Sequence, residues 1–262
     1  MSVVLRENEW AEDMIKSNTL GKKPSETLRR AARYYMDQEY RTRDVRKLLE
    51  SFVLRCDPNI SLPKWDDTID RAISKAEKFN AIEIDYIDIT KPEIDTINSL
   101  QGRQIKRLAF TLLCLSKFWT IVDPMRDYWI INKDSEIMAM ANINTSVRRQ
   151  SELYWTLREL GLIKFSKKVD NTNIRVCFTE PGDVVLKISD LRNLGYQYQR
   201  FCGEAYFECQ NCGLVVKLKD PVRGKNRRYC NACASRTVAE QRQTEIINEP
   251  AIIKNYKIGC VL

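Results

Sequence analysis

The chain has 262 residues, 44% of them hydrophobic and 30% charged, an ordinary composition for a folded protein with room for two modest domains. It has no histidine, which excludes Ser-His-Asp and Cys-His nucleophile systems and His-ligated metal hydrolases. No run of 18 apolar residues occurs, and the amino-terminal segment turns acidic within seven residues. We therefore expect no membrane span, no signal peptide and a cytoplasmic location.

The net charge of +8 is unevenly distributed. Residues 1–100 carry 17 Lys and Arg against 19 Asp and Glu, residues 101–200 carry 16 against 10, and residues 201–262 carry 10 against 6. Because the excess lies toward the C-terminal end, a partner that bears phosphates is expected to bind there first.

Amphipathic helices are predicted over most of the first hundred residues. In "KPSETLRRAARYYMDQ" the apolar residues from Leu28 to Tyr35 recur at helical spacing, and the same period returns in "TRDVRKLLESFVLRC" and "KWDDTIDRAISKAEKF". The basic stretch "GKKPSETLRRAARYY" is interpreted as a solvated helical face, since nearby acids almost cancel its charge.

The period then changes to two residues. "AIEIDYIDI" alternates Ile82, Ile84 and Tyr86 with acidic residues, which is typical of a half-buried strand. Helix returns with Thr90 as the predicted N-cap and Glu93 three residues later, the spacing of a capping box.

The middle of the chain has the element order of a winged helix-turn-helix domain. Between about 103 and 180, the predicted elements are a helix in "QIKRLAFTLLCLSKFW", a strand in "YWIIN", a helix in "DSEIMAMA", a turn, a helix in "SVRRQSELYWTLRELGLI" and a hairpin formed by "LIKFSKK" and "NIRVCF". The turn of this hairpin is expected at Asp170 and Asn171.

The third of these helices is a candidate for base recognition. Arg148, Arg149 and Gln150 lie at its N-terminal end, where the residues of a recognition helix reach base edges, and their side chains suit guanine and adenine. Lys167 and Lys168 of the hairpin are expected to hold the adjacent backbone.

The rest of the same helix leaves two interpretations open. Val147, Tyr154, Leu157 and Leu160 are expected in the core, as is Trp155. Glu152 and Glu159 share the surface with Arg148 and weaken deep docking against phosphates. Because winged helices also serve as protein-docking modules, a protein interface is the alternative.

Four cysteines provide the clearest chemical motif. Cys209, Cys212, Cys230 and Cys233 form two C-x-x-C pairs around a 17-residue loop, and one tight turn per pair can aim both thiolates at one tetrahedral ion. Zinc is the predicted metal, with iron as the alternative. Four sulfurs leave no open position for water, so the ion is expected to be structural. Cys202 falls outside the paired spacing.

The loop between these pairs is basic. Contact with phosphates is predicted for Lys217, Lys219, Arg223, Lys225, Arg227 and Arg228, joined by Arg236 in an expected helix after the last pair. The alternative is that these cations only keep a small metal-bound unit soluble. A helix after the second pair favours a treble-clef finger, and a zinc ribbon remains open.

Two resemblances add to this interpretation. "RRQSELYWTLRELGLIKFSKK" is similar to the third helix and wing of bacterial winged-helix regulators and replication initiators. The whole arrangement, with "ETLRRAARYY", "KRLAFTLLCLSKFW" and "RRYCNACA", resembles a group of uncharacterised proteins encoded by bacteriophages and mobile elements. The resemblance implies a phage-derived cytoplasmic protein and does not imply a reaction.

The sequence thus predicts a mainly α fold of the α+β class, with a helical domain at 1–100, a winged-helix domain at 101–200 and a zinc-finger domain with a tail at 201–262. The expected function is non-enzymatic binding of nucleic acid, with double-stranded DNA favoured over RNA, in regulation or replication. The alternative is an interaction protein or inhibitor that binds a host machine such as RNA polymerase, a replication factor or a CRISPR-type defence complex. A carboxylate- and magnesium-dependent nuclease is a third reading, for which no carboxylate cluster stands out.

Overall fold

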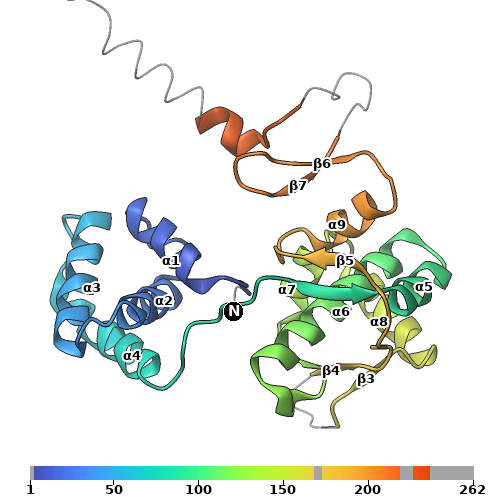
Figure 1. Cartoon of the computed structure of the whole chain (residues 1–262), viewed down its shortest axis with the longest axis horizontal. Coiled ribbons are helices and arrows are strands. Elements are labelled where there is room, and N and C mark those ends of the chain that lie inside the picture. The colour runs from blue at the N-terminus through green and yellow to red at the C-terminus, as the bar shows by residue number, and fades with distance from the viewer. Residues whose placement is uncertain (1–2, 168–172, 219–226, 237–262) are drawn as a thin grey trace, which may run out of the picture.

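The computed structural model describes residues 3–167, 173–218 and 227–236. Helices dominate these ranges and the strands form small sheets, which confirms the predicted mainly helical α+β class. The buried side chains of these ranges gather in a helical bundle near the N-terminus, a larger core around one long helix, and a small cysteine cluster. Figure 1 shows the bundle beside the larger core and the cysteine-containing module next to helix α9.

The N-terminal bundle confirms the predicted helical periodicity. Leu28, Leu49, Phe52 and Ile69 are fully buried between its helices. The elements are α1 (Glu7–Lys16), α2 (Pro24–Asp37), α3 (Thr42–Cys56), the short 3-10 helix η1 (Leu62–Lys64) and α4 (Asp66–Ala76).

The arginines of α2 correct one expectation. Arg30 and Arg33 are buried rather than solvated, because α1 packs over them. Nε of Arg30 lies 3.0 Å from one carboxylate oxygen of the buried Glu7, and Arg33 donates to the other at 2.7 Å. A buried carboxylate is tolerated when it is paired and hydrogen-bonded in this way.

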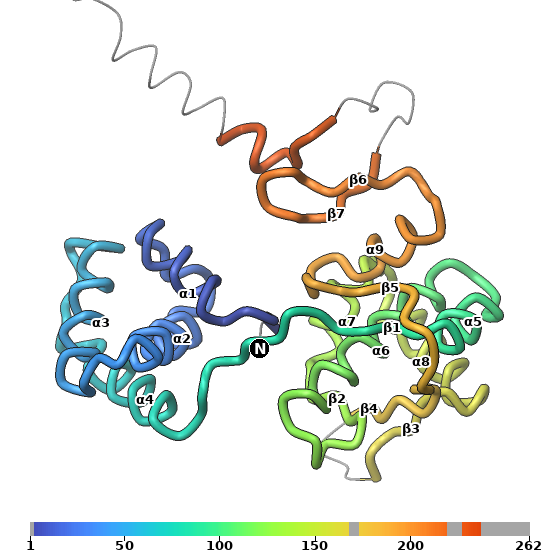
Figure 2. The backbone as a smooth tube through the Cα atoms, in the orientation of Figure 1, coloured from blue at the N-terminus to red at the C-terminus, as the bar shows by residue number. Residues whose placement is uncertain are grey.

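The strand after the bundle begins later than its alternation predicts. Strand β1 (Ile87–Thr90) buries Ile87 and Ile89, whereas Tyr86 is 43% exposed, so the predicted inward phase is wrong at that residue. The cause is a different partner for residues 82–84. Their backbone pairs with residues 5–7, and Ile84 N donates to Leu5 O at 2.8 Å, before the chain crosses to the larger core (Figure 2).

Strand β1 pairs antiparallel with β5 (Val184–Ile188) and leads into α5 (Lys91–Ser99). The capping box is confirmed: the Thr90 side chain caps the backbone at Glu93, and the Glu93 carboxylate accepts the Thr90 N–H at 2.8 Å.

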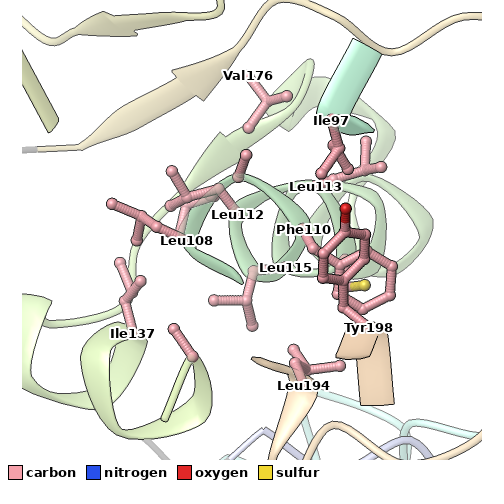
Figure 3. Close-up of a cluster of buried hydrophobic side chains, with 14 of the residues drawn as sticks. Ile97, Leu108, Phe110, Leu112, Leu113, Leu115, Ile137, Val176, Leu194 and Tyr198 are labelled. Atoms are coloured by element: carbon pink, nitrogen blue, oxygen red, sulfur yellow. The ribbon is translucent and has the colours of Figure 1, made fainter. Parts of the chain in front are cut away.

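Helix α6 (Arg103–Val122) is the centre of the larger core. Its buried side chains point to every side, as expected of a helix enclosed by its neighbours (Figure 3). Ile97 of α5, Ile137 of α7 (Asp134–Met140) and Leu194 of α9 (Leu194–Phe201) pack around it. Ile87, Ile89, Ile94, Ile97 and Leu100 belong to this cluster, so the boundary expected at residue 100 lies inside it.

The elements that follow α6 have the order expected from the sequence. They are η2 (Pro124–Arg126), β2 (Trp129–Ile130), α7, α8 (Val147–Glu159), β3 (Ile163–Phe165) and β4 (Ile174–Val176). The strands form an antiparallel sheet in the order β2-β4-β3, in which Arg175 faces both Trp129 and Lys164. The hairpin turn, with Lys168, Asp170 and Asn171, lies outside the described residues.

Helix α9 connects this core to the cysteine module. It packs so closely on the end of α7 that a Cβ atom at Gly195 would overlap the carbonyl group of Ala141. The chain continues into the antiparallel strands β6 (Tyr206–Glu208) and β7 (Val215–Lys217), and residues 231–236 are helical. In the part of the chain that the structure describes, no helix combines the length and apolar character needed to cross a membrane.

Candidate metal centre and nucleic-acid interface

The four predicted ligand cysteines come together at one point. The sulfur atoms of Cys209, Cys212, Cys230 and Cys233 all lie within 4.8 Å of one another. Those of Cys212 and Cys230 are 3.8 Å apart, far beyond a disulfide bond of ~2.05 Å. A tetrahedral ion held at ~2.3 Å by each sulfur needs sulfur–sulfur distances of ~3.8 Å. The arrangement is therefore compatible with a zinc site.

The first pair is formed by the turn that joins β6 to β7. The N–H of Cys209 donates to Leu214 O at 3.0 Å, and the N–H of Gly213 donates to Cys209 O at 2.8 Å. Gly213 has φ +69°, a left-handed conformation that glycine adopts without steric cost. This turn places the Cys209 and Cys212 thiols on the same side.

The second pair is held against the first. The N–H of Cys230 points at Cys209 Sγ at 3.3 Å, and the N–H of Cys233 points at Cys230 Sγ at 3.5 Å. The N–H of Gln210 in the first turn donates to Arg228 O at 2.9 Å. Both pairs are thus joined by backbone hydrogen bonds as well as by the expected metal.

The surroundings shift the pKa values of the Cys209 and Cys212 thiols in opposite directions. Burial raises the pKa of Cys212 to about 12. At Cys209 burial also acts upward, but backbone N–H groups led by that of Cys230 outweigh it and lower the pKa to about 6. Because metal binding requires thiolates, a cation here would release protons from the set.

The basic residues of the module divide into two groups. Arg227 lies over the Phe207 ring at 5.4 Å, and Arg236 donates toward Cys233 Sγ at 3.7 Å, so both guanidinium groups contact the module itself. Lys217 and Arg228 are exposed. The predicted contacts Lys219, Arg223 and Lys225 lie outside the described residues.

Comparisons with known proteins give no family. No family model matches the chain, and no significant match was found among curated proteins or solved structures. The resemblance to phage and mobile-element proteins therefore stays a prediction, and function has to be inferred from the geometry of the sites themselves.

The predicted recognition residues lie at the exposed start of α8. Ser146 caps the helix, and its hydroxyl accepts the Arg149 N–H at 3.3 Å. The side chains of Arg148 and Arg149 are 91% and 53% exposed. Gln150 is turned back, because its amide donates to Thr145 O at 2.9 Å. Two of the three predicted base-contacting side chains are therefore available at the surface.

Glu152 limits the charge that these arginines present. Its carboxylate lies 3.4 Å from Nε of Arg148 and 2.9 Å from Nη1 of Arg149. The hydrogen bond from Arg149 lowers the pKa of Glu152, so this acid stays ionised at neutral pH and offsets part of the positive charge.

The buried stripe of α8 differs in part from the predicted one. Tyr154 and Leu157 are buried as expected, but Val147 and Leu160 are 77% and 56% exposed, because both lie at the ends of the helix, beyond the core. Trp155, expected in the core, is 51% exposed. Leu153 is buried and was missed, although it lies one turn before Leu157. The inner face thus runs through 153, 154 and 157.

The hairpin beside α8 carries further cations. Lys167 is exposed just after β3, as predicted, and Lys164 within β3 is also exposed. The alternation of β3, with Ile163 buried and Lys164 outward, is the signal that identifies this missed lysine. Arg175 of β4 is not free, since it pairs with Asp127 at 2.5 Å.

Proposed function

We propose that the chain is a non-enzymatic nucleic-acid-binding protein that contacts double-stranded DNA through α8 and the β3–β4 hairpin. The observation that carries this proposal is the order α6, β2, α7, α8, β3, β4 with an antiparallel sheet β2-β4-β3. This is the order of a winged helix-turn-helix, in which the second helix of the pair enters the major groove and the hairpin lies along the backbone.

The metal module supplies the second contact in this proposal. Zinc bound by Cys209, Cys212, Cys230 and Cys233 has no open position for substrate, so its role is structural. A hairpin followed by the helical residues 231–236 favours a treble-clef finger over a ribbon. The exposed Lys217 and Arg228 are the described cations from which a phosphate contact is proposed. A cytoplasmic protein of phage or mobile-element origin, acting in regulation or replication, fits this proposal.

Glu152 provides a sharp test on α8. Glu152→Gln removes the carboxylate that pairs with Arg148 and Arg149, so affinity for a duplex of random sequence should rise by up to about fivefold. The control is Glu50→Gln on α3, whose carboxylate pairs with Arg46 at 3.3 Å, away from the proposed interface. An equal rise in both variants would indicate a nonspecific effect of net charge.

Removing a cation tests the same surface in the opposite direction. Arg148→Ala should weaken binding. The slope of log affinity against log salt concentration should become shallower by about one, the value expected for the loss of one phosphate contact. A slope unchanged in both Arg148→Ala and Arg149→Ala would exclude α8 as the contact. Parallel titrations with an RNA hairpin decide between DNA and RNA.

A protein interface on α8 is the second proposal, favoured by its exposed apolar residues. Val147, Trp155 and Leu160 are all more than half exposed, while Glu152 offsets the neighbouring arginines. In this case, affinity purification of the tagged protein from a host lysate would retain a host nucleic-acid machine, for example a polymerase or defence complex. It would be retained at equal stoichiometry with and without nuclease. Trp155→Ala should release it, whereas Arg148→Ala should not.

A further inference from the structure

A cleft separates the N-terminal bundle from the C-terminal end of α6. Its volume is about 730 Å³, within the range of ~300–1,000 Å³ typical of small-molecule sites. One wall comes from α2 and α4, another from residues 78–84, and the opposite wall from the last turn of α6, η2 and Ile131. None of these residues belongs to α8 or to the cysteine module.

The wall formed by α2 and α4 is strongly cationic. Arg29, Arg33 and Lys75 line it beside the adjacent Lys78. A second pocket that shares Arg29 and Lys75 extends this surface toward Lys23, Arg71 and the acidic Glu26. The acids that line the main cleft are already engaged. Glu7 binds Arg30 and Arg33, and Glu83 accepts the N–H of Asn8 at 2.8 Å.

Two guanidinium groups in the cleft have unused donors. Nε of Arg29 and Nε of Arg33 are buried and have no hydrogen-bond partner among the described residues. Burial, and next the charge of Arg33, lowers the pKa of Arg29, although the charges of Glu26 and Glu7 act in the opposite direction. A buried donor without a partner costs free energy, and an anion that accepts these N–H groups would remove that cost.

The opposite wall is mainly apolar. Its Arg126 pairs with Asp123 at 3.4 Å and lies over the Trp119 ring at 5.3 Å. Ile121 and Ile131 line the cleft with 51% and 37% exposure, and Phe79 is 61% exposed at its edge. This wall lies at the C-terminal end of α6, where the helix dipole disfavours negative charge. A ligand would therefore place its anionic end against α2 and α4 and its apolar end against α6 and Phe79.

We propose that this cleft binds a nucleotide, with the phosphates held by Arg29, Arg33 and Lys75 and the base against Phe79 and Ile121. One wall of the cleft is rich in hydrogen-bond donors and the opposite wall is mainly apolar. This arrangement favours a small molecule that carries both a phosphate group and a flat ring. The proposal does not depend on the DNA-binding proposal, because the two sites share no residue.

The test is calorimetric titration of the full-length protein with ADP, GDP, CDP and UDP, and with inorganic pyrophosphate as the probe without a ring. At least one nucleoside diphosphate should bind saturably and more tightly than pyrophosphate. Arg29→Gln and Lys75→Gln should each lower its affinity by about tenfold, since each removes a charged donor.

Matched variants separate this site from the overall charge. Arg43→Gln and Lys47→Gln remove the same charge from exposed positions on α3 that do not line the cleft, and they should leave the affinity within about twofold. Phe79→Ala should weaken the nucleotide and leave pyrophosphate unchanged. Thermal melting of each variant establishes that it is folded before titration.

Four results would overturn the proposal. The first is that no nucleoside diphosphate binds saturably. The second is that pyrophosphate binds as tightly as the best nucleotide, which would leave an anion site without a base site. The third is that the folded Arg29→Gln and Lys75→Gln variants bind the nucleotide as tightly as the unaltered chain does. The fourth is that the α3 variants lose as much affinity as the cleft variants.

Discussion

The core around α6 and the module of β6 and β7 are held together by different means. The interior around α6 is built from aliphatic and aromatic side chains drawn from most of the elements between β1 and α9. The module buries three cysteines, packed against Cys212, Leu214 and Val216. Burial of apolar area can stabilise the first region. The second is too small for that, so we propose that it depends on a metal ion held by its four sulfurs. The two regions should therefore respond to different perturbations.

Metal removal should produce the largest difference between them. Chelation, or Cys230→Ser, should abolish the folded structure of the module, since zinc binding supplies about 10–16 kcal/mol in small finger domains. Hydrogen exchange should then rise in residues 206–217 and stay slow in α6. Cys202→Ser is the control, because this exposed cysteine lies outside the ligand set. A module that keeps its protection after chelation would refute the metal requirement.

A cavity in the apolar core should have the next largest effect, on the other region. Leu112 is fully buried in α6, and Leu112→Ala should lower the free energy of unfolding by about 2–5 kcal/mol. Denaturant unfolding followed by circular dichroism measures the loss. Metal affinity should stay unchanged. A variant that lost zinc to the same degree would show that the two regions do not fold independently.

A substitution at Tyr206 tests the contact between the α6 core and the module of β6 and β7. This buried residue of β6 donates to Gln199 Oε1 of α9 at 2.6 Å, and its hydroxyl accepts from Arg103 and Arg107 of α6 at 3.2 Å each. Tyr206→Phe removes one of the hydrogen bonds that each of these groups makes and should cost about 1–3 kcal/mol. Tyr196→Phe is the matched control, because the Tyr196 ring packs on Tyr206 but makes no hydroxyl hydrogen bond among the described residues. Equal losses in the two variants would show that the hydrogen bonds of the Tyr206 hydroxyl do not account for the effect.

The smallest effect is expected at the surface. Arg192 pairs with Asp190 and donates to Cys212 O at 2.5 Å, so it links the loop before α9 to the first cysteine turn. Because the side chain is 54% exposed, Arg192→Gln should cost at most about 1 kcal/mol. The loss should appear as faster hydrogen exchange in the cysteine turn. Arg175→Gln, which breaks an exposed pair with Asp127 in the β2-β4-β3 sheet, should leave that turn unaffected.

Features set by local spacing were predictable from the sequence. The two C-x-x-C pairs brought four sulfurs together, and the Thr90 capping box formed as its spacing indicated. The order of elements from α6 to β4 also followed from periodicity, because amphipathic helices and short alternating strands carry their own signal.

Features set by distant partners were not predictable. Arg30 and Arg33 look like surface residues until α1 brings Glu7 onto them. The strand phase near Tyr86 failed because residues 82–84 pair with residues 5–7, which no local pattern reveals. The cationic cleft was missed for the same reason, since its walls come from α2, α4, residues 78–84 and the end of α6, segments up to about ninety residues apart.

The contact at Gly195 has a mechanical consequence. Because backbone meets backbone there, and Asn142 beside it accepts the N–H of Tyr196 at 3.1 Å and donates to Asn193 at 3.0 Å, α9 and the end of α7 have little freedom to slide. This contact limits how far the spacing between the start of α8 and the root of the cysteine module can change. If both surfaces engage one duplex, any mismatch between that spacing and straight DNA has to be taken up by the DNA, so sequences that bend easily should be preferred even at base pairs that no side chain touches.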